Sequence, residues 1–318
     1  MEGSIRMRGA LAQVMNWFGA PARPRAPQSA GRVLFDDRAA PPPAPQPAPA
    51  RRHLDPEPPP PPPVRWPQSK LKVLGAIWGE GFLGPGGAEE ALTLSKPLGL
   101  NQTHSVLNLG AGLGGATRAL AVESGAWVTG YETDLDLARA AQALSEKHKV
   151  EKKAEIRHLD LANPQIRQGY YHHALALEAL WRIPDKAPVI AALVGGVKPQ
   201  GQVVLTDLAL GAPSPSAERA FNAWAQLEGV TPCLAGEKAL SGLLTKAGLD
   251  IRICEDITPR HISQTVSAWA AFVEELKRDR PSRPFAIQVV AEAERCMRRI
   301  DLLRTGRLRL LRWHAIRR

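Results

Sequence analysis

The stretch of this chain best suited to binding a reactive group is a set of glycines that follows an apolar run. Residues 106–120 read VLNLGAGLGGATRAL, with glycine at positions 110, 112, 114 and 115. The apolar run has the pattern of a buried parallel strand, and the glycines leave bare backbone beyond its end. Glycine adopts positive φ, and a helix starting near Ala116 points free N–H groups toward the same turn. The stretch therefore predicts a cradle for a cofactor.

Two acids stand where the next two predicted strands end. The segment 127–131 reads as a second strand that ends at Glu132, and 156–159 as a third that is followed by Asp160. Carboxyl ends of parallel strands meet at one edge of a sheet, where α/β folds bind ligands. We expect Glu132 to accept hydrogen bonds from both hydroxyls of a ribose and Asp160 from an adenine amino group.

The glycine spacing alone leaves the cofactor open. Gly110, Gly112 and Gly115 also satisfy G-x-G-x-x-G, the fingerprint of dinucleotide-binding folds. Against a nicotinamide oxidoreductase stand the second acid, Asp160, and the position of the fingerprint about 100 residues into the chain. The predicted terminal hairpin, which has no recognisable hydride-transfer residues, also stands against it.

Alternating strands and helices must position this turn, which predicts an α/β fold with a mostly parallel sheet. Further strands are expected at 174–177, 202–206, 251–254 and 308–316. Helices are expected at 135–147, 186–197, 216–228, 237–247, 261–277 and 284–303. The fifth strand is expected to end at Asp207, and the alternating Leu and Arg of 308–316 indicate a reversed last strand.

The chain resembles the class I S-adenosylmethionine-dependent methyltransferases, in particular the branch with phosphoethanolamine, sarcosine and dimethylglycine N-methyltransferases. The residues that carry the resemblance are WGEGFLGPGG at 78–87, NLGAGLGG at 108–115, YE at 131–132, LD at 159–160, LEA at 177–179, PDK at 184–186 and KPQG at 198–201. The resemblance extends from about Lys70 to the C-terminus. It implies a Rossmann-like, seven-stranded methyltransferase sheet with helices on both faces, S-adenosylmethionine as cofactor and a small-molecule methyl acceptor, here an amine.

The resemblance also assigns residues to the site. It implies cofactor contacts by Asn108, Gly110, Ala111, Gly112, Gly114, Glu132, Asp160, Leu161 and Glu178. It implies a substrate cleft lined by Trp78, Glu80, Phe82, Trp181 and Arg182, although 78–87 could instead pack as a loop on the sheet edge. The candidates for a catalytic side chain are Glu178, Arg182 and Asp207, with an N-cap as the other interpretation of Asp207, and no metal site is predicted.

The sequence departs from the phosphoethanolamine branch at the residues that handle the acceptor. Arg182 stands where that branch has a histidine, and no tyrosine precedes Tyr131. A guanidinium is always charged and cannot act as a base, although it could bind a carboxylate or phosphate bidentately. Phosphoethanolamine specificity is therefore not expected. A methyltransferase-fold scaffold that has lost transfer, held in a larger assembly, is the alternative.

Composition divides the chain into three parts. Residues 1–19 could form a short amphipathic helix that docks on a partner protein or an anionic membrane surface, or else a helix that frays in water. Residues 20–68 are rich in Pro and Ala and predict a disordered tether, because proline removes donors and little apolar surface is available for burial. Residues 69–318 are expected to form the methyltransferase domain.

Charge and cysteine usage limit the partners and the compartment. The net charge of +10 is concentrated at the two ends, with an excess of +6 on residues 1–75 and +9 on 277–318, which leaves −5 on the middle. A basic tail without interleaved aromatic residues does not predict a nucleic-acid partner. Three separated cysteines indicate reduced thiols, and no apolar run is long enough to cross a bilayer. A cytoplasmic protein, peripheral at most to a membrane or assembly, is expected.

Overall fold

The computed structural model describes residues 12–14, 16–18, 66–211, 217–278 and 281–318. Most of the predicted tether, and residues 1–11, 15 and 19 of the predicted N-terminal helix, lie outside the described residues. Among the described residues, no helix is long and apolar enough to span a membrane.

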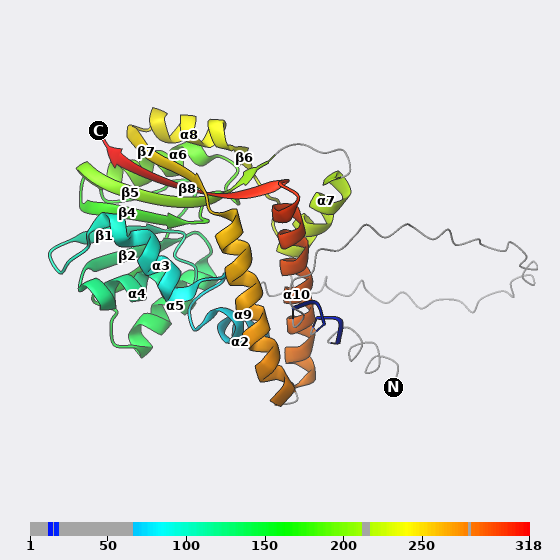
Figure 1. The fold of residues 1–318 in the computed structure, drawn as a ribbon. Coiled ribbons are helices and arrows are strands. Elements are labelled where there is room, and N and C mark those ends of the chain that lie inside the picture. Colours follow the sequence, from blue (N-terminus) through cyan, green and yellow to red (C-terminus); the bar gives the residue numbers. More distant parts are fainter. Residues whose placement is uncertain (1–11, 15, 19–65, 212–216, 279–280) are drawn as a thin grey trace, which may run out of the picture. The chain divides into compact units, whose positions relative to one another are not determined.

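The core of the described chain is one mixed sheet (Figure 1). Its strands are β1 (Ser105–Leu109), β2 (Trp127–Glu132), β3 (Ala154–His158), β4 (Tyr171–Leu177), β5 (Val197–Leu210), β6 (Ala235–Gly236), β7 (Leu249–Asp256) and β8 (Leu308–Arg317). The strand order is β3-β2-β1-β4-β5-β8-β7, with two-residue β6 paired to β5. Neighbours from β3 to β5 are parallel, whereas β8 runs antiparallel to β5 and β7. The predicted fold class and reversed last strand are confirmed.

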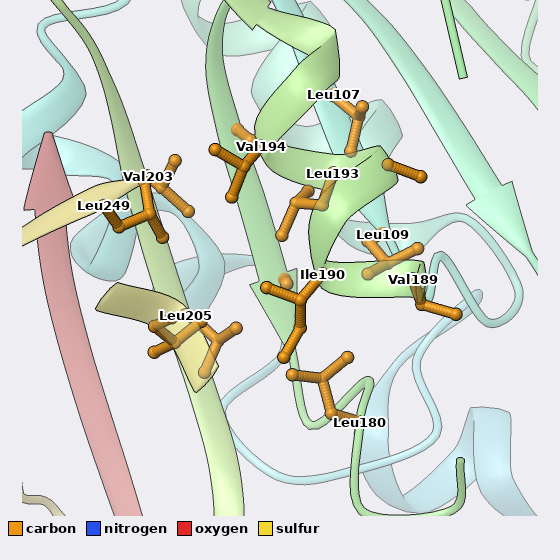
Figure 2. Packing of buried hydrophobic residues seen from close by; sticks show 14 of the residues in the cluster. Leu107, Leu109, Leu180, Val189, Ile190, Leu193, Val194, Val203, Leu205 and Leu249 are labelled. Atoms are coloured by element: carbon orange, nitrogen blue, oxygen red, sulfur yellow. The ribbon is translucent and has the colours of Figure 1, made fainter. Parts of the chain in front are cut away.

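Helices cover both faces of the sheet. They are α2 (Gln68–Trp78), α3 (Gly87–Ser95), α4 (Gly115–Ser124), α5 (Leu135–Lys147), α6 (Lys186–Gly196), α7 (Ala217–Glu228), α8 (Glu237–Lys246), α9 (Thr258–Arg278) and α10 (Arg283–Arg304), with a short 3₁₀ turn at Lys96–Leu98. Figure 2 shows Ile190 and Leu193 of α6 packed with Leu107 and Leu205 of the sheet. Leu94 of α3 and Leu120 of α4 pack with a second set of strand side chains.

The fifth strand is longer than predicted. The sequence predicts residues 202–206, but β5 spans Val197–Leu210 because β8 pairs with it from Gln202 opposite Ile316 to Leu210 opposite Leu308. Asp207 consequently lies within the strand, opposite Leu311, and its side chain is completely buried. The expectation that Asp207 ends the strand is therefore wrong.

Of the two long helices, α9 begins and α10 ends at the carboxyl edge of the parallel strands. Helix α9 follows β7 directly, and α10 ends just before β8 starts opposite the end of β5. The two helices lie side by side and also contact α2 (Figure 1). Along α9 the buried residues Thr265, Trp269, Phe272 and Val273 recur at helical spacing, which gives the helix one apolar face.

The N-terminal helical residues pack on this helix group. Val14 and Phe18 are 3% and 2% exposed, and the Phe18 ring stacks on Trp269 with centroids 4.6 Å apart and planes 12° apart. Val14 and Phe18, two residues of the apolar side of the predicted amphipathic helix, are thus buried within the same chain. Docking of residues 1–19 on a membrane or another protein finds no support in this arrangement.

Replacement of Phe18 tests this packing. We expect Phe18→Ala to lower the free energy of unfolding by about 3 kcal/mol, because it removes a buried ring and exposes Trp269. Gln13→Ala, which changes an exposed residue of the same segment, is the matched control. Chemical denaturation of the full chain measures both, and a Phe18 variant as stable as the control would contradict the packing.

Candidate functional site

The glycine turn after β1 is open backbone held against two neighbouring strands. Gly110 and Gly112 have φ values of 72° and 56°, which glycine adopts at little cost. A Cβ on Gly110 would lie 2.6 Å from the Ala179 Cβ, so a larger residue could not fit beside the end of β4. The N–H groups of Gly110 and Ala111 donate to the Tyr131 carbonyl over 2.8 and 3.0 Å. This turn is a rigid platform for a ligand.

The Glu132 carboxylate joins the end of β2 to this turn. Its Oε2 accepts from the Gly112 N–H at 2.7 Å, its Oε1 accepts from the Asp134 N–H at 2.9 Å, and the residue is 7% exposed. A carboxylate has about four acceptor positions, so both oxygens keep capacity for further donors. A pair of vicinal hydroxyls is a group that such a fixed carboxylate can bind.

The ends of β3 and β1 supply the remaining predicted cofactor residues. Asp160 is exposed, with its Oδ1 accepting from the Ala162 N–H at 2.9 Å, and the Leu161 side chain is 39% exposed. An exposed leucine beside a carboxylate offers a flat apolar surface and an acceptor to a nucleobase. Asn108 is buried instead, and its amide donates to Thr117 Oγ1 at 2.9 Å, which fixes α4 on β1.

The loop between α2 and α3 covers the glycine turn. The Gly81 carbonyl accepts from the Gly115 N–H at 2.9 Å, and a Cβ on Gly112 would approach Leu83 Cδ1 to 3.1 Å. A Cβ on Gly115 would meet the Phe82 ring at 2.8 Å, so Phe82 lies directly over the turn. This loop can exclude water from a ligand bound below it.

Two other residues of the predicted cleft segment lie elsewhere. Trp78 is 5% exposed and packs edge-to-face with Trp269, with ring centroids 6.5 Å apart. The Glu80 carboxylate pairs with Lys147 and His148 at the end of α5, over 2.6 and 2.7 Å. These two side chains therefore anchor the loop rather than line an opening.

Glu178 follows the last residue of β4, and its carboxylate is paired with an arginine. Its φ is 51°, and its carboxylate bonds Arg299 of α10 and lies 3.8 Å from Nδ1 of His261 of α9. Burial would raise the pKa of Glu178, but the charge and hydrogen bond of Arg299, together with the other positive groups nearby, outweigh burial and lower it. Glu178 is consequently a carboxylate held between two helices. Its neighbour in the chain, Ala179, packs against the glycine turn at Gly110.

Arg182 belongs to a second charged group, which is centred on Glu228. The Glu228 carboxylate accepts from Trp224 Nε1 at 2.9 Å, from Arg295 at 2.9 Å and from Arg182 at 3.3 Å. Arg295 also pairs with Glu292. The Arg182 guanidinium lies 4.3 Å from the centre of the Trp181 ring. Its charge is thus matched within the chain.

Asp207 and Trp181 are enclosed by packing. Asp207 Oδ1 accepts from the Trp181 N–H at 3.1 Å, and burial raises the pKa of Asp207 to about 8. Trp181 is 1% exposed and lies against the Trp224 ring, with centroids 5.7 Å apart. Neither side chain faces an opening, so both support the loop after β4 from below.

Three residues of the site do not stand out in the sequence: His261, Arg295 and Arg299. A usable signal exists on α10, where Glu292, Arg295 and Arg299 interrupt an apolar face at spacings of three and four residues. Charged residues on a buried helix face need partners, which suggests a network. His261 follows the acid-rich turn at 255–258, but a lone histidine gives no signal of its own.

Within the described residues, no group of three or more His, Cys, Asp or Glu side chains is arranged to hold a metal ion.

Comparisons with known proteins agree with this geometry. Residues 107–205 match a family described as a methyltransferase domain. The chain is 26% identical over 194 residues to phosphoethanolamine N-methyltransferase 2 of Caenorhabditis elegans, which covers 58% of this chain and 41% of the relative. The chain thus spans less than half the length of that relative.

Solved structures share the fold. Phosphoethanolamine N-methyltransferase 2 of Haemonchus contortus, solved with phosphomonomethylethanolamine and S-adenosylhomocysteine, superposes with a TM-score of 0.65 at 20% identity, covering 78% of this chain and 57% of the other. A putative sarcosine dimethylglycine methyltransferase from Galdieria sulphuraria superposes with a TM-score of 0.64 at 15% identity, covering 78% and 98%. The predicted resemblance to class I methyltransferases is confirmed.

The Glu228 cluster predicts a pH-dependent stability. Burial would raise the pKa of Glu228, but Arg295, Arg299 and Arg182 outweigh burial and lower it to about 2. Because this value lies below the ordinary 4.5, the cluster stabilises the fold fully above pH 4.5 and loses that contribution as pH falls toward 2. We expect Glu228→Gln to lower the free energy of unfolding by about 3 kcal/mol at neutral pH.

Denaturant titrations across this pH range measure the effect. The difference between wild type and Glu228→Gln should be constant above pH 4.5 and shrink below it. Glu294→Gln, which breaks the half-exposed pair with Arg298 on the same helix, should cost less than about 1 kcal/mol. Equal effects of the two substitutions would show that the cluster is not coupled as described.

Proposed function

We propose that this chain, with its methyltransferase domain at residues 107–205, transfers a methyl group from S-adenosylmethionine to a small-molecule acceptor at an amine nitrogen. The observation that carries the proposal is the bond from the Gly112 N–H to the Glu132 carboxylate at 2.7 Å. This bond holds a carboxylate beside the glycine-rich turn, which supports a ribose site there. The residues present therefore fit an adenosine: the glycine turn as cradle, Glu132 for the ribose, and Asp160 with Leu161 for the base.

Methyl transfer requires mainly that the methyl donor and the acceptor are aligned. The bound cofactor supplies a methyl group already activated by its sulfonium, so the protein needs no strong acid or base for transfer. The chain's part is to hold donor and acceptor in line, which lowers the barrier by removing translational freedom. The loop with Phe82 and Leu83 excludes water from the turn, and Glu178 marks the end of β4 where the acceptor would approach.

The acceptor class rests on the relatives. The phosphoethanolamine N-methyltransferases named above transfer to nitrogen, as their name states, which favours an amine here. Their phosphate specificity is not carried over, because Arg182 replaces the branch's histidine and its guanidinium is engaged by Glu228. None of the observations above specifically supports a scaffold that has lost methyl transfer.

Ligand-dependent thermal unfolding of the full chain tests the cofactor. S-adenosylmethionine and S-adenosylhomocysteine should each raise the melting temperature with increasing concentration, since a ligand that binds only the folded state stabilises it. NAD should not. Stabilisation by NAD alone would end the methyltransferase proposal. Label transferred from methyl-labelled donor to a small molecule in a cell extract would exclude the scaffold.

Substitution of Glu132 tests the ribose assignment. Glu132→Ala should weaken S-adenosylhomocysteine binding by about 1.5–3 kcal/mol, roughly ten- to hundred-fold, because a charge-assisted hydrogen bond is lost. Titration calorimetry measures the dissociation constant. Glu155→Ala, on neighbouring β3 and paired with exposed Arg157, should bind as wild type does. An unchanged Glu132 variant would refute the assignment.

A further inference from the structure

A small cavity lies at the carboxyl ends of β4 and β5, directly beyond the glycine turn. Its volume is about 60 Å³, which is room for about four to six water-sized groups. Its walls come from α3, α9, the α2–α3 loop and the strand ends: Pro85, Glu90, Leu94, Leu177, Glu178, Thr206, Ile257, His261, Gln264 and Leu310. Ala179 touches the turn at Gly110 and follows Glu178 in the chain, so the cavity adjoins the proposed donor site.

The charged groups of this cavity favour a ligand without an anionic group. Glu178 bonds Arg299, and Glu90 accepts from Gln264 Nε2 at 2.6 Å and pairs with Arg260. Both carboxylates are lining residues, whereas the two arginines are not. Among the described residues, the cavity wall therefore presents carboxylates, amide, hydroxyl and apolar groups but no lysine or arginine. A phosphate or carboxylate on the ligand would meet like charge.

His261 faces this cavity as a buried polar side chain that lacks a hydrogen-bonding partner in the part of the chain that the structure describes. The residue is 5% exposed, and the Glu178 carboxylate lies 3.8 Å from Nδ1, beyond hydrogen-bond range. Its backbone is fixed, because its N–H donates to the Ile257 carbonyl and its own carbonyl accepts from the Thr265 hydroxyl. A ring nitrogen that lines the cavity without such a partner is available to a hydrogen-bonding group of a ligand.

The protonation of His261 suits an acceptor of hydrogen bonds. Burial lowers the pKa of His261 to about 4, and the charge of Glu178 does not offset this. The other charged groups near it, Arg299 and Arg295 of α10, lower that pKa further. At neutral pH the ring is thus uncharged and keeps one nitrogen that can accept an N–H.

We propose that His261 binds the methyl acceptor by accepting a hydrogen bond from its nitrogen, and that this acceptor is a small amine without a phosphate or carboxylate. The proposal rests on the proposed function and specifies its substrate class. Donation of the amine N–H to His261 then leaves the lone pair of the amine nitrogen directed away from the ring.

The transfer step balances with the groups present. The amine enters unprotonated; its lone pair forms the N–C bond while the electrons of the C–S bond return to sulfur, which becomes a neutral thioether. The positive charge moves to the methylated nitrogen, where the Glu178 carboxylate stabilises it. The product ammonium releases its proton to water on leaving, and His261 is uncharged before and after the step.

Binding to the full chain saturated with S-adenosylhomocysteine tests the proposal. The probes are N-methylethanolamine, with about five non-hydrogen atoms to match the cavity, and its phosphorylated counterpart, phosphomonomethylethanolamine. At mildly alkaline pH we expect the first probe to raise the melting temperature further and the second to have no effect. His261→Phe should weaken binding of the first probe by about tenfold or more.

Three further measurements separate binding from structure. His261→Asn, which keeps an acceptor oxygen, should restore part of the binding, and His104→Phe, at the opposite edge of the sheet before β1, should bind as wild type does. In turnover assays His261→Phe should raise KM for N-methylethanolamine. All three variants should bind S-adenosylhomocysteine equally.

The outcomes are distinguishable. Equal or tighter binding of the phosphorylated probe, binding of neither probe, or an unaffected His261→Phe variant would overturn the proposal while the proposed function stands. Failure of S-adenosylhomocysteine itself to stabilise the wild-type chain would count against the proposed function instead.

Discussion

A hydrogen bond from the Gly112 N–H to the Glu132 carboxylate joins the main chain after β1 to the end of β2. It holds the turn in a shape that only glycine adopts easily, and it fixes a carboxylate at the edge where parallel strands end. The covering loop, the end of β4 and the adjoining cavity are all placed relative to this turn. The arrangement offers a ligand rigid backbone and a few oriented oxygens.

A second layer of the site comes from the C-terminal helices. Arg299 and Arg295 on α10 neutralise Glu178 and Glu228, which lie at or near the carboxyl edge. Buried ion pairs cost desolvation free energy and are retained where geometry satisfies them. Here they hold the carboxylate of Glu178 in one place at the cavity wall, which His261 also lines. The helices thereby contribute to the site as well as to the core.

The sequence predicts the glycine turn and the position of Glu132 well, because local sequence patterns determine both. Apolar runs followed by glycine, together with single acids at strand ends, are enough to place the turn and Glu132. The strand pairing that extends β5 past Asp207 is not local, because it depends on β8, about 100 residues later in the chain. A strand-end acid in the sequence consequently becomes a buried acid with a pKa of about 8 in the fold.

Long-range contacts also explain the other differences between the predicted and the observed positions of the site residues. Trp78 and Glu80 look like cleft residues because they flank a glycine-rich loop, yet packing on Trp269 and pairing with Lys147 decide where they lie. His261 carries no local signal, and only the approach of α9 to the end of β4 brings it beside Glu178. Likewise, the apolar face predicted for residues 1–19 suggests a surface for a partner, but Phe18 of that face stacks on Trp269.

The crystal structure of the full chain with S-adenosylhomocysteine is the most direct measurement of the central claim. The account predicts both ribose hydroxyls within hydrogen-bonding distance of the Glu132 carboxylate, the adenine beside Asp160 and Leu161, and the sulfur facing the cavity next to Glu178. A nucleoside bound elsewhere, or a Glu132 side chain turned away from it, would contradict the account.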